Sequence, residues 1–191
     1  MKRLLVLSLF LISGLIVHAQ ENYTNTSVQI LPQSKLTIKG DTNIKDFECE
    51  FNTANLEENK NIEYTHTGKG ISFKNAVLCL DNLGFDCGNR GINEDFRDLI
   101  QAEKYPEILL KLNEINLENP KLAEAKVTIF IAGKSRRYVV PVNIVDDSIP
   151  YFKGKLTLNI KDFDLEAPKK ALGLIVVKEE IEVNFNLSVA K

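Results

Sequence analysis

The segment CGNRGINEDFRDLIQAEKYPEI, Cys87–Ile108, decides the fold, because it holds the one convincing helical pattern beyond the N-terminal region. Phe96, Leu99 and Ile100 recur at i, i+3 and i+4, which predicts a narrow apolar stripe on a helix over about 93–104. A single short helix has no second helix to pack against. It must therefore cover a sheet or close a barrel.

The ends of this helix are predicted from its flanking residues. Asn93 is a good N-cap, and Glu94 and Asp95 place negative charge where the helix dipole favours it. Pro106 disfavours helix for the residue before it, so the chain is expected to return to a strand there.

The N-terminal residues 1–19 are expected to be a cleaved signal peptide. Lys2 and Arg3 precede an apolar run from Leu4 to Val17, and Ala19 completes a cleavage pattern before position 20. The run is shorter than the roughly 20 residues of a spanning helix, so no permanent membrane anchor is expected. We predict one periplasmic or secreted domain over 20–191.

Alternating apolar and polar residues dominate the rest of the chain. The clearest case is the last segment, in which Ile181, Val183 and Phe185 alternate with Glu182 and Asn184. Further segments with this period begin at Leu36, Phe47, Ile62, Ile71, Ile108, Val127, Tyr138 and Leu156. Such a period indicates antiparallel strands with one dry and one wet face. About eight long strands in sequence predict a closed up-and-down barrel.

Three local features carry their own expectations. Residues 20–27 are polar and are expected to form a loose arm. Ile71–Leu80 is expected to be one long strand of about 33 Å. Pro141 interrupts a strand pattern, which predicts a bulge or an edge-like bend.

Composition and motifs exclude several classes of function. The net charge of −2 offers no basic stripe for nucleic acid. Beyond the signal region His66 is the only histidine, and it lies in an alternating strand without a nucleophile motif nearby. No phosphate loop and no paired-histidine metal motif occurs. We therefore expect neither an enzyme nor a metal site nor a cofactor.

The three cysteines predict one disulfide and one leftover thiol in an oxidising compartment. Cys79 with Cys87 would close a short loop, whereas Cys49 with Cys87 would tie an early strand to the start of the helical segment. Spacing alone leaves both pairings open.

The order of motifs resembles the YceI-like family of polyisoprenoid-binding, lipocalin-like periplasmic proteins. The segments that carry the resemblance are SKLTIKGDTNIKDFECEF (34–51), GINEDFRDLIQAEKYPEILLKL (91–112), IAGKSRRYVVPVNI (131–144), FKGKLTLNIKDFDLEAP (152–168) and GLIVVKEEIEVNFNL (173–187). The resemblance implies an extended eight-stranded antiparallel lipocalin-like β-barrel with one short capping helix. It also favours the Cys49–Cys87 disulfide.

The resemblance further implies a non-catalytic carrier for a long amphiphilic isoprenoid lipid, such as a prenyl quinone or a polyprenyl phosphate. Lining and lid residues would then be Phe73, Leu78, Phe96, Leu99, Ile100, Leu110, Leu112, Ile129, Val140, Val142, Leu156, Leu158, Val183 and Phe185. Basic residues after Gly133 (Lys134, Arg136, Arg137) would meet an anionic headgroup or simply solvate a turn.

The alternative is a secreted stress-response or interaction protein whose barrel is filled by its own side chains. An interior formed by eight strands permits either outcome. The expected assembly is a monomer or a homodimer.

Overall fold

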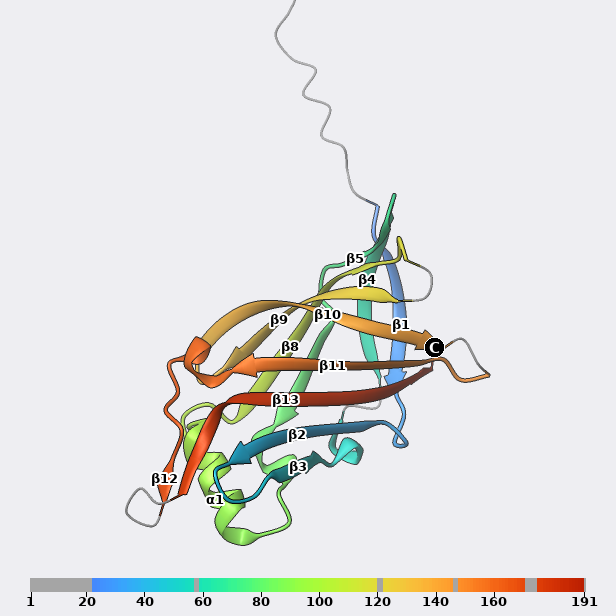
Figure 1. The fold of residues 1–191 in the computed structure, drawn as a ribbon. Helices are drawn as coiled ribbons and strands as arrows, with labels where there is room; N and C mark the ends of the chain where they lie inside the picture. Colours follow the sequence, from blue (N-terminus) through green and yellow to red (C-terminus); the bar gives the residue numbers. More distant parts are fainter. Residues whose placement is uncertain (1–21, 57–58, 120–121, 146–147, 171–174, 191) are drawn as a thin grey trace, which may run out of the picture.

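The computed structural model describes residues 22–56, 59–119, 122–145, 148–170 and 175–190. The predicted signal peptide therefore lies outside the described residues. Within them the chain folds into one 13-stranded sheet with a single α-helix and three short 3-10 helices (Figure 1). No helix in these ranges is both long and apolar enough to span a bilayer.

The strands are β1 (Thr24–Ile30), β2 (Lys35–Thr42), β3 (Phe47–Phe51), β4 (Lys60–Thr67), β5 (Gly70–Phe73), β6 (Val77–Asp81), β7 (Phe85–Asp86), β8 (Glu107–Asn116), β9 (Ala123–Ile131), β10 (Lys134–Val145), β11 (Tyr151–Asn159), β12 (Lys169–Lys170) and β13 (Ile175–Ala190). The helices are α1 (Arg90–Leu99), η1 (Thr53–Asn55), η2 (Asn82–Gly84) and η3 (Ile160–Phe163).

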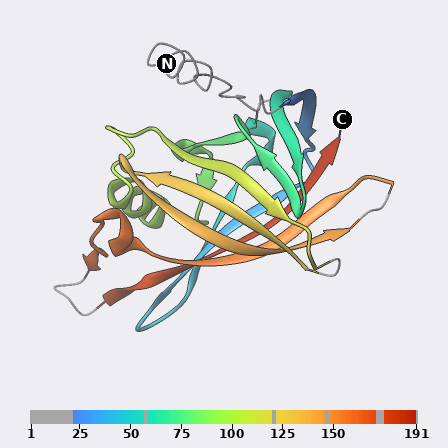
Figure 2. The ribbon, with the colours of Figure 1, turned by 90° about the horizontal axis from the view of Figure 1, so that it is seen from above.

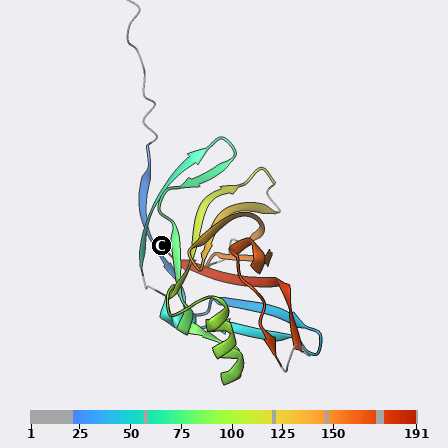
Figure 3. The same ribbon diagram turned by 90° about the vertical axis from the view of Figure 1, so that its left-hand side faces the viewer.

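Eight strands close a ring, as predicted. They follow the order β1–β4–β5–β8–β9–β10–β11–β13, and β13 returns to β1 through Gln29–Ala190 and Ile30–Val189. All of these pairings are antiparallel. Beyond β1, the long strand β13 also pairs with β2, which carries β3 and β7 alongside the ring. Figure 2 shows the strong twist of these strands, and Figure 3 shows α1 at one end of the barrel.

The core consists of two buried clusters at opposite ends of the barrel. The helix-end cluster contains Leu36, Cys49, Phe51, Leu56, Leu80, Phe85, Cys87, Phe96, Ile100, Ile108, Ile129, Ile131, Ala132, Leu158, Ile160, Phe163, Leu165 and Ile181. The far-end cluster contains Ile115, Ala123, Ala125, Val140 and Val142. Strand β9 runs from one to the other, with Ala123 and Ala125 in the second and Ile129 and Ile131 in the first.

Two predictions about strands are wrong. The expected loose arm over 20–27 includes most of β1, in which Thr24–Val28 pair residue by residue with β4. Polar Asn and Thr residues form a strand there because a partner strand satisfies their backbone. The expected long strand Ile71–Leu80 is broken at residues 74–76, where Asn75 Oδ1 accepts a hydrogen bond from Glu63 N at 2.6 Å.

Of the bulge or edge-like bend predicted at Pro141, the bulge is absent on the β9 side. The register between β10 and β9 runs without a break through the Pro141–Glu124 pair. Pairing with β11 begins one residue later, at Val142 and Gly154. The missing N–H of proline is thus accommodated where the second ladder begins, and no extra residue is inserted.

Candidate functional site

The inner face of the barrel is a continuous apolar surface built by cross-strand neighbours. Val183 on β13 pairs with Ile38 on β2 and with Leu156 on β11. On the other side of the ring, Leu110 on β8 pairs with Leu78 and Ile129. Cross-strand partners present their side chains on the same face of a sheet, so each pairing extends the apolar lining.

All fourteen predicted lining and lid residues belong to one of the two core clusters or pack against one. Six of them are buried in one of the two clusters: Phe96, Ile100, Ile129, Leu158, Val140 and Val142. The other eight are half-buried and pack against a cluster: Phe73, Leu78, Leu99, Leu110, Leu112, Leu156, Val183 and Phe185. Their contact with a ligand stays a prediction.

Between the clusters lies a waist of four half-buried side chains that pack against both: Val127, Tyr138, Leu156 and Phe185. These side chains face inward and yet keep accessible surface. Buried residues on the same strands mark the two ends, as with Leu158 at 6% and Val142 at 4% exposure.

Two members of the waist, Val127 and Tyr138, were not among the predicted lining residues. The sequence indicated both residues. Val127 lies two positions before Ile129, and Tyr138 lies two positions before Val140, so each shares the face of its strand with a predicted lining residue. Phe152 also packs against the far-end cluster. It lies four positions before Leu156 on β11, so the two residues share one face of that strand with Gly154 between them.

Tyr138 gives the apolar waist a polar edge. Its hydroxyl donates a hydrogen bond to Asp162 Oδ2 at 3.1 Å, and its ring stacks on Phe163 with centroids 6.4 Å apart. Partial burial, and then the negative charge of Asp162, raises the pKa of Tyr138 to about 12. The phenol therefore stays protonated, and remains a donor, throughout the physiological range.

Of the basic residues after Gly133, the first is already paired. Lys134 Nζ lies 2.7 Å from Asp164 Oδ2, and this neighbour lowers the pKa of the Asp164 carboxyl. Arg136 and Arg137 are exposed. Arg136 precedes Tyr138 by two residues on β10, so both lie on the same face of that strand.

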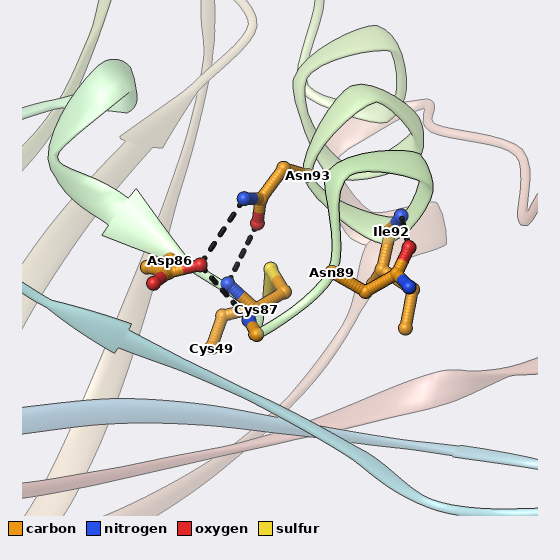
Figure 4. The surroundings of a disulfide bond; sticks show 7 residues. Cys49, Asp86, Cys87, Asn89, Ile92 and Asn93 are labelled. Atoms are coloured by element: carbon orange, nitrogen blue, oxygen red, sulfur yellow. Dashed lines mark hydrogen bonds between the residues drawn. A yellow bond between two sulfur atoms is a disulfide. The ribbon is translucent and has the colours of Figure 1, made fainter.

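Helix α1 closes one end of the barrel with Phe96 and with Ile100, its C-cap residue, and a disulfide fixes its approach (Figure 4). Cys49 on β3 is bonded to Cys87, so the predicted pairing is confirmed. Both cysteines are buried. Cys79 is the free cysteine of the described residues and is half-buried, with Lys60 Nζ 4.0 Å from its sulfur.

The predicted start of the helix is wrong. Asn89 is the N-cap, and its Oδ1 accepts hydrogen bonds from Gly91 N at 2.8 Å and Ile92 N at 3.4 Å. Asn93 lies inside the helix, where its side chain turns back toward the disulfide. Its Oδ1 accepts from Cys87 N at 2.6 Å, and its Nδ2 donates to Asp86 Oδ1 at 3.1 Å (Figure 4).

The helix also ends earlier than predicted. Its last residue is Leu99, and Gln101 then takes a left-handed conformation with φ of 55°. The predicted stop before Pro106 therefore marks the start of β8, not the end of α1.

This chain is similar to known proteins in sequence and in fold. The model of the YceI-like domain matches residues 72–189. The chain belongs to the YceI-like family. No curated protein matches it. Solved structures share the fold of this YceI-like chain at low sequence identity.

Three of these structures illustrate the range of TM-score, sequence identity and coverage. Burkholderia cenocepacia BcnA has a TM-score of 0.63 at 18% identity and covers 83% of this chain and 96% of its own. A polyisoprenoid-binding domain from Saccharophagus degradans, implicated in plant cell wall breakdown, has a TM-score of 0.60 at 15% identity and covers 88% and 98%. The Campylobacter jejuni YceI protein has a TM-score of 0.51 at 16% identity and covers 94% and 92%.

Among the described residues, two of the pockets on the outer surface of this YceI-like barrel are shallow and open. One, of about 550 Å³, is polar and is lined by Asp86, Gly88, Asn89, Arg90, Asn93, Glu94 and Arg97. The other, of about 440 Å³, includes Lys35, Lys153, Lys155 and Asn184. These four residues alternate along their strands with inward side chains, so the pocket opens on the outer surface, and Gly154 and Phe185 also line it.

The described residues hold no group of three or more His, Cys, Asp and Glu side chains that could bind a metal ion. His66 is exposed on β4, where its ring contacts Tyr64 with centroids 5.6 Å apart.

Proposed function

We propose that this chain binds a long amphiphilic lipid of the polyisoprenoid class in the barrel interior and carries it without chemical change. The observation that supports this most is the half-buried waist of Val127, Tyr138, Leu156 and Phe185. A barrel meant only to pack on itself would bury these side chains, because close packing stabilises the fold.

Transfer of the apolar chain supplies the driving force. Each methylene removed from water contributes about 0.8 kcal/mol, so a tail of several isoprene units binds without specific polar contacts. The apolar lining described above runs along the barrel between the two clusters, which suits an extended tail better than a compact ligand.

The polar end of the lipid would lie near β10 and η3. The exposed guanidinium of Arg136 lies on the same face of β10 as Tyr138 and offers donors, whereas the single Tyr138 hydroxyl hydrogen is already donated to Asp162 Oδ2. Guanidinium donors suit a quinone carbonyl or a phosphate. An oxidising compartment, periplasmic or extracellular, agrees with the Cys49–Cys87 disulfide.

The binding test is extraction of the protein purified from cells that make polyprenyl lipids, followed by mass spectrometry. We expect a polyisoprenoid at a substantial fraction of one molecule per chain. Protein recovered without lipid, and unable to take up a polyprenyl lipid added in detergent, would leave the interaction protein with a filled barrel as the better reading.

A matched pair of variants locates the lipid. Leu156 is half-buried in the waist, whereas Val139 on the outer face of β10 is 57% exposed. Leu156→Trp is expected to reduce bound lipid several-fold, and Val139→Trp to leave it unchanged. Leu158 is a poorer probe because it is 6% exposed in the helix-end cluster, where added bulk would disturb packing. Equal lipid in both variants would place the ligand outside the waist.

A further inference from the structure

Two exposed apolar residues lie on hydrogen-bonded neighbouring segments at the helix end of the barrel. Ile44 is at the turn between β2 and β3 and is 68% exposed, the highest value among the exposed large hydrophobic residues described. Val176, near the start of β13, is 44% exposed. Figures 1 and 3 show the end of β2 and the start of β13 at the same end of the molecule as α1. We call Ile44 and Val176 the apolar tip.

Hydrogen bonds hold the two halves of this tip in place. Asn43 N donates to Val176 O at 3.2 Å, and Val176 N donates to Asn43 Oδ1 at 2.9 Å. Thr42 Oγ1 accepts from Ile44 N at 3.1 Å and Lys45 N at 2.9 Å, and it donates to Lys45 O at 2.8 Å. The position of Ile44 is therefore set by the fold.

These hydrogen bonds also lower the cost of moving the backbone of the tip out of water. A turn normally exposes backbone groups that need water, and burying them unpaired is costly. Here Thr42 and Asn43 pair the N–H groups of Ile44, Lys45 and Val176 within the protein. The tip is thus able to leave water with little loss of hydrogen bonding.

The shape and size of the tip point to a lipid surface. Turn positions usually carry Gly, Asn, Asp or Ser, so an isoleucine that is 68% exposed at a turn favours a partner outside the chain. Two protruding side chains are far smaller than a specific protein interface, which buries roughly 1,200 Å² or more. A fluid bilayer surface accepts a small convex apolar protrusion.

The charges around the tip allow such contact without demanding anionic lipid. Lys178 Nζ pairs with Asp41 Oδ2 at 3.0 Å, and Lys45 and Asp46 follow Ile44 directly. Lysine stems lie along apolar surface while the ammonium groups reach headgroups. Lys169 and Lys170 on β12 also pair with the start of β13, and Glu180 adds a further negative charge near Lys178. Since charges of both signs surround the tip, the apolar side chains must supply the attraction.

We propose that the apolar tip formed by Ile44 and Val176 inserts reversibly into the surface of a phospholipid bilayer. This docking goes beyond the proposed lipid carriage and needs no bound cargo. If the protein is a carrier, the tip brings its helix end to the membrane in which a polyisoprenoid resides.

Vesicle flotation tests the proposal. Protein purified after export, with its N-terminus checked by mass spectrometry, is mixed with large phosphatidylcholine vesicles. We expect the unmodified protein to float with them, Ile44→Glu to reduce the partition coefficient about tenfold or more, and Ile44→Glu with Val176→Glu to abolish flotation. All variants share one N-terminus, so any contribution from that region is common to them.

Ile149→Glu is the matched control, because Ile149 is 43% exposed and precedes β11 at the opposite end of the barrel (Figure 1). It should float like the unmodified protein. The proposal is overturned if the unmodified protein fails to float, if Ile44→Glu floats equally well, or if Ile44→Glu instead lowers the oligomeric mass measured by light scattering. Extraction of lipid from the same preparations reports separately on carriage, so either proposal is able to fail alone.

Discussion

The phenyl ring of Phe185 lies across Gly154, its partner on the neighbouring strand. A β-carbon added at Gly154 would come within 2.3 Å of Phe185 Cζ and 2.9 Å of the carbonyl oxygen of Pro141. Glycine at this position therefore creates the space through which Phe185 reaches both core clusters. The waist of the barrel depends on this one missing methyl group.

Replacing Gly154 by alanine should force the Phe185 ring to move. Overpacking of this kind typically costs about 1–3 kcal/mol, so we expect the free energy of unfolding to fall by that amount in urea titrations. Gly68→Ala is the control, because an added β-carbon there has no atom within 4 Å, and it should change stability by less than about 0.5 kcal/mol. Equal effects at the two glycines would contradict the assigned contact.

Phe185→Leu in the Gly154→Ala background tests the same contact from the other side. The shorter side chain leaves room for the methyl group, so part of the lost stability should return. If the two substitutions simply add, the ring and the methyl group do not meet.

The Cys49–Cys87 disulfide should be a major source of stability. It joins positions 38 residues apart, and restricting an unfolded chain over that length is worth about 4 kcal/mol in the chain-entropy model. We expect the double variant Cys49→Ala/Cys87→Ala to lose stability on that scale in chemical denaturation. Cys79→Ala should retain most of the original value and the full response to reductant, because Cys79 is the free cysteine.

The two asparagines at the start of α1 should respond differently to substitution. Asn89→Ala removes the N-cap and should cost about 1 kcal/mol, while Asn89→Ser should restore most of it. Asn93→Ala removes the acceptor for Cys87 N and should cost about 1–3 kcal/mol. Serine at 93 is too short to replace that acceptor, so rescue by serine at 93 as well would argue against separate roles.

The sequence predicts much of this architecture because period-two alternation survives in the folded strands. In β13, Ile181, Val183 and Phe185 face the interior as expected. Closure into a ring follows from the number and order of such strands. The disulfide pairing, by contrast, came from the family resemblance, since spacing left Cys79 and Cys49 as equal partners for Cys87.

Alternation fails where strands shift register, because one extra residue reverses the inward face. Phe73 and Leu78 both pack on the interior although they are five residues apart, and the break at 74–76 absorbs the change. In the same way, Leu112 and Ile115 are three residues apart on β8 and both pack in the far-end cluster, because a register shift lies between them. A single continuous strand over 71–80 would place Phe73 and Leu78 on opposite faces of the sheet.

The helix boundaries were wrong for a different reason. Two asparagines lie four residues apart, and local preference ranks both as caps. The choice depends on Cys87, whose N–H needs an acceptor once the disulfide has fixed its place, and Asn93 supplies it. Such a requirement arises only in the tertiary structure.

Tyr138 should make the stability of the fold depend on alkaline pH. In the unfolded chain the phenol titrates near pH 10, whereas in the fold burial and then Asp162 raise the pKa to about 12. The folded state therefore favours the protonated phenol. This contribution is fully present below pH 10 and is lost as the pH rises from about 10 to about 12.

The unmodified protein and Tyr138→Phe are to be compared by urea titration at intervals from pH 8 to 11.5. Other tyrosines and the lysines titrate in both proteins, so the difference between the two curves isolates position 138. Tyr138→Phe should lack the part of the alkaline decline that this phenol causes, and absorbance at 295 nm should show one late-titrating tyrosine fewer. Parallel pH curves would mean that the hydroxyl titrates alike in the folded and unfolded chains, and would remove Tyr138 as a fixed donor at the edge of the waist.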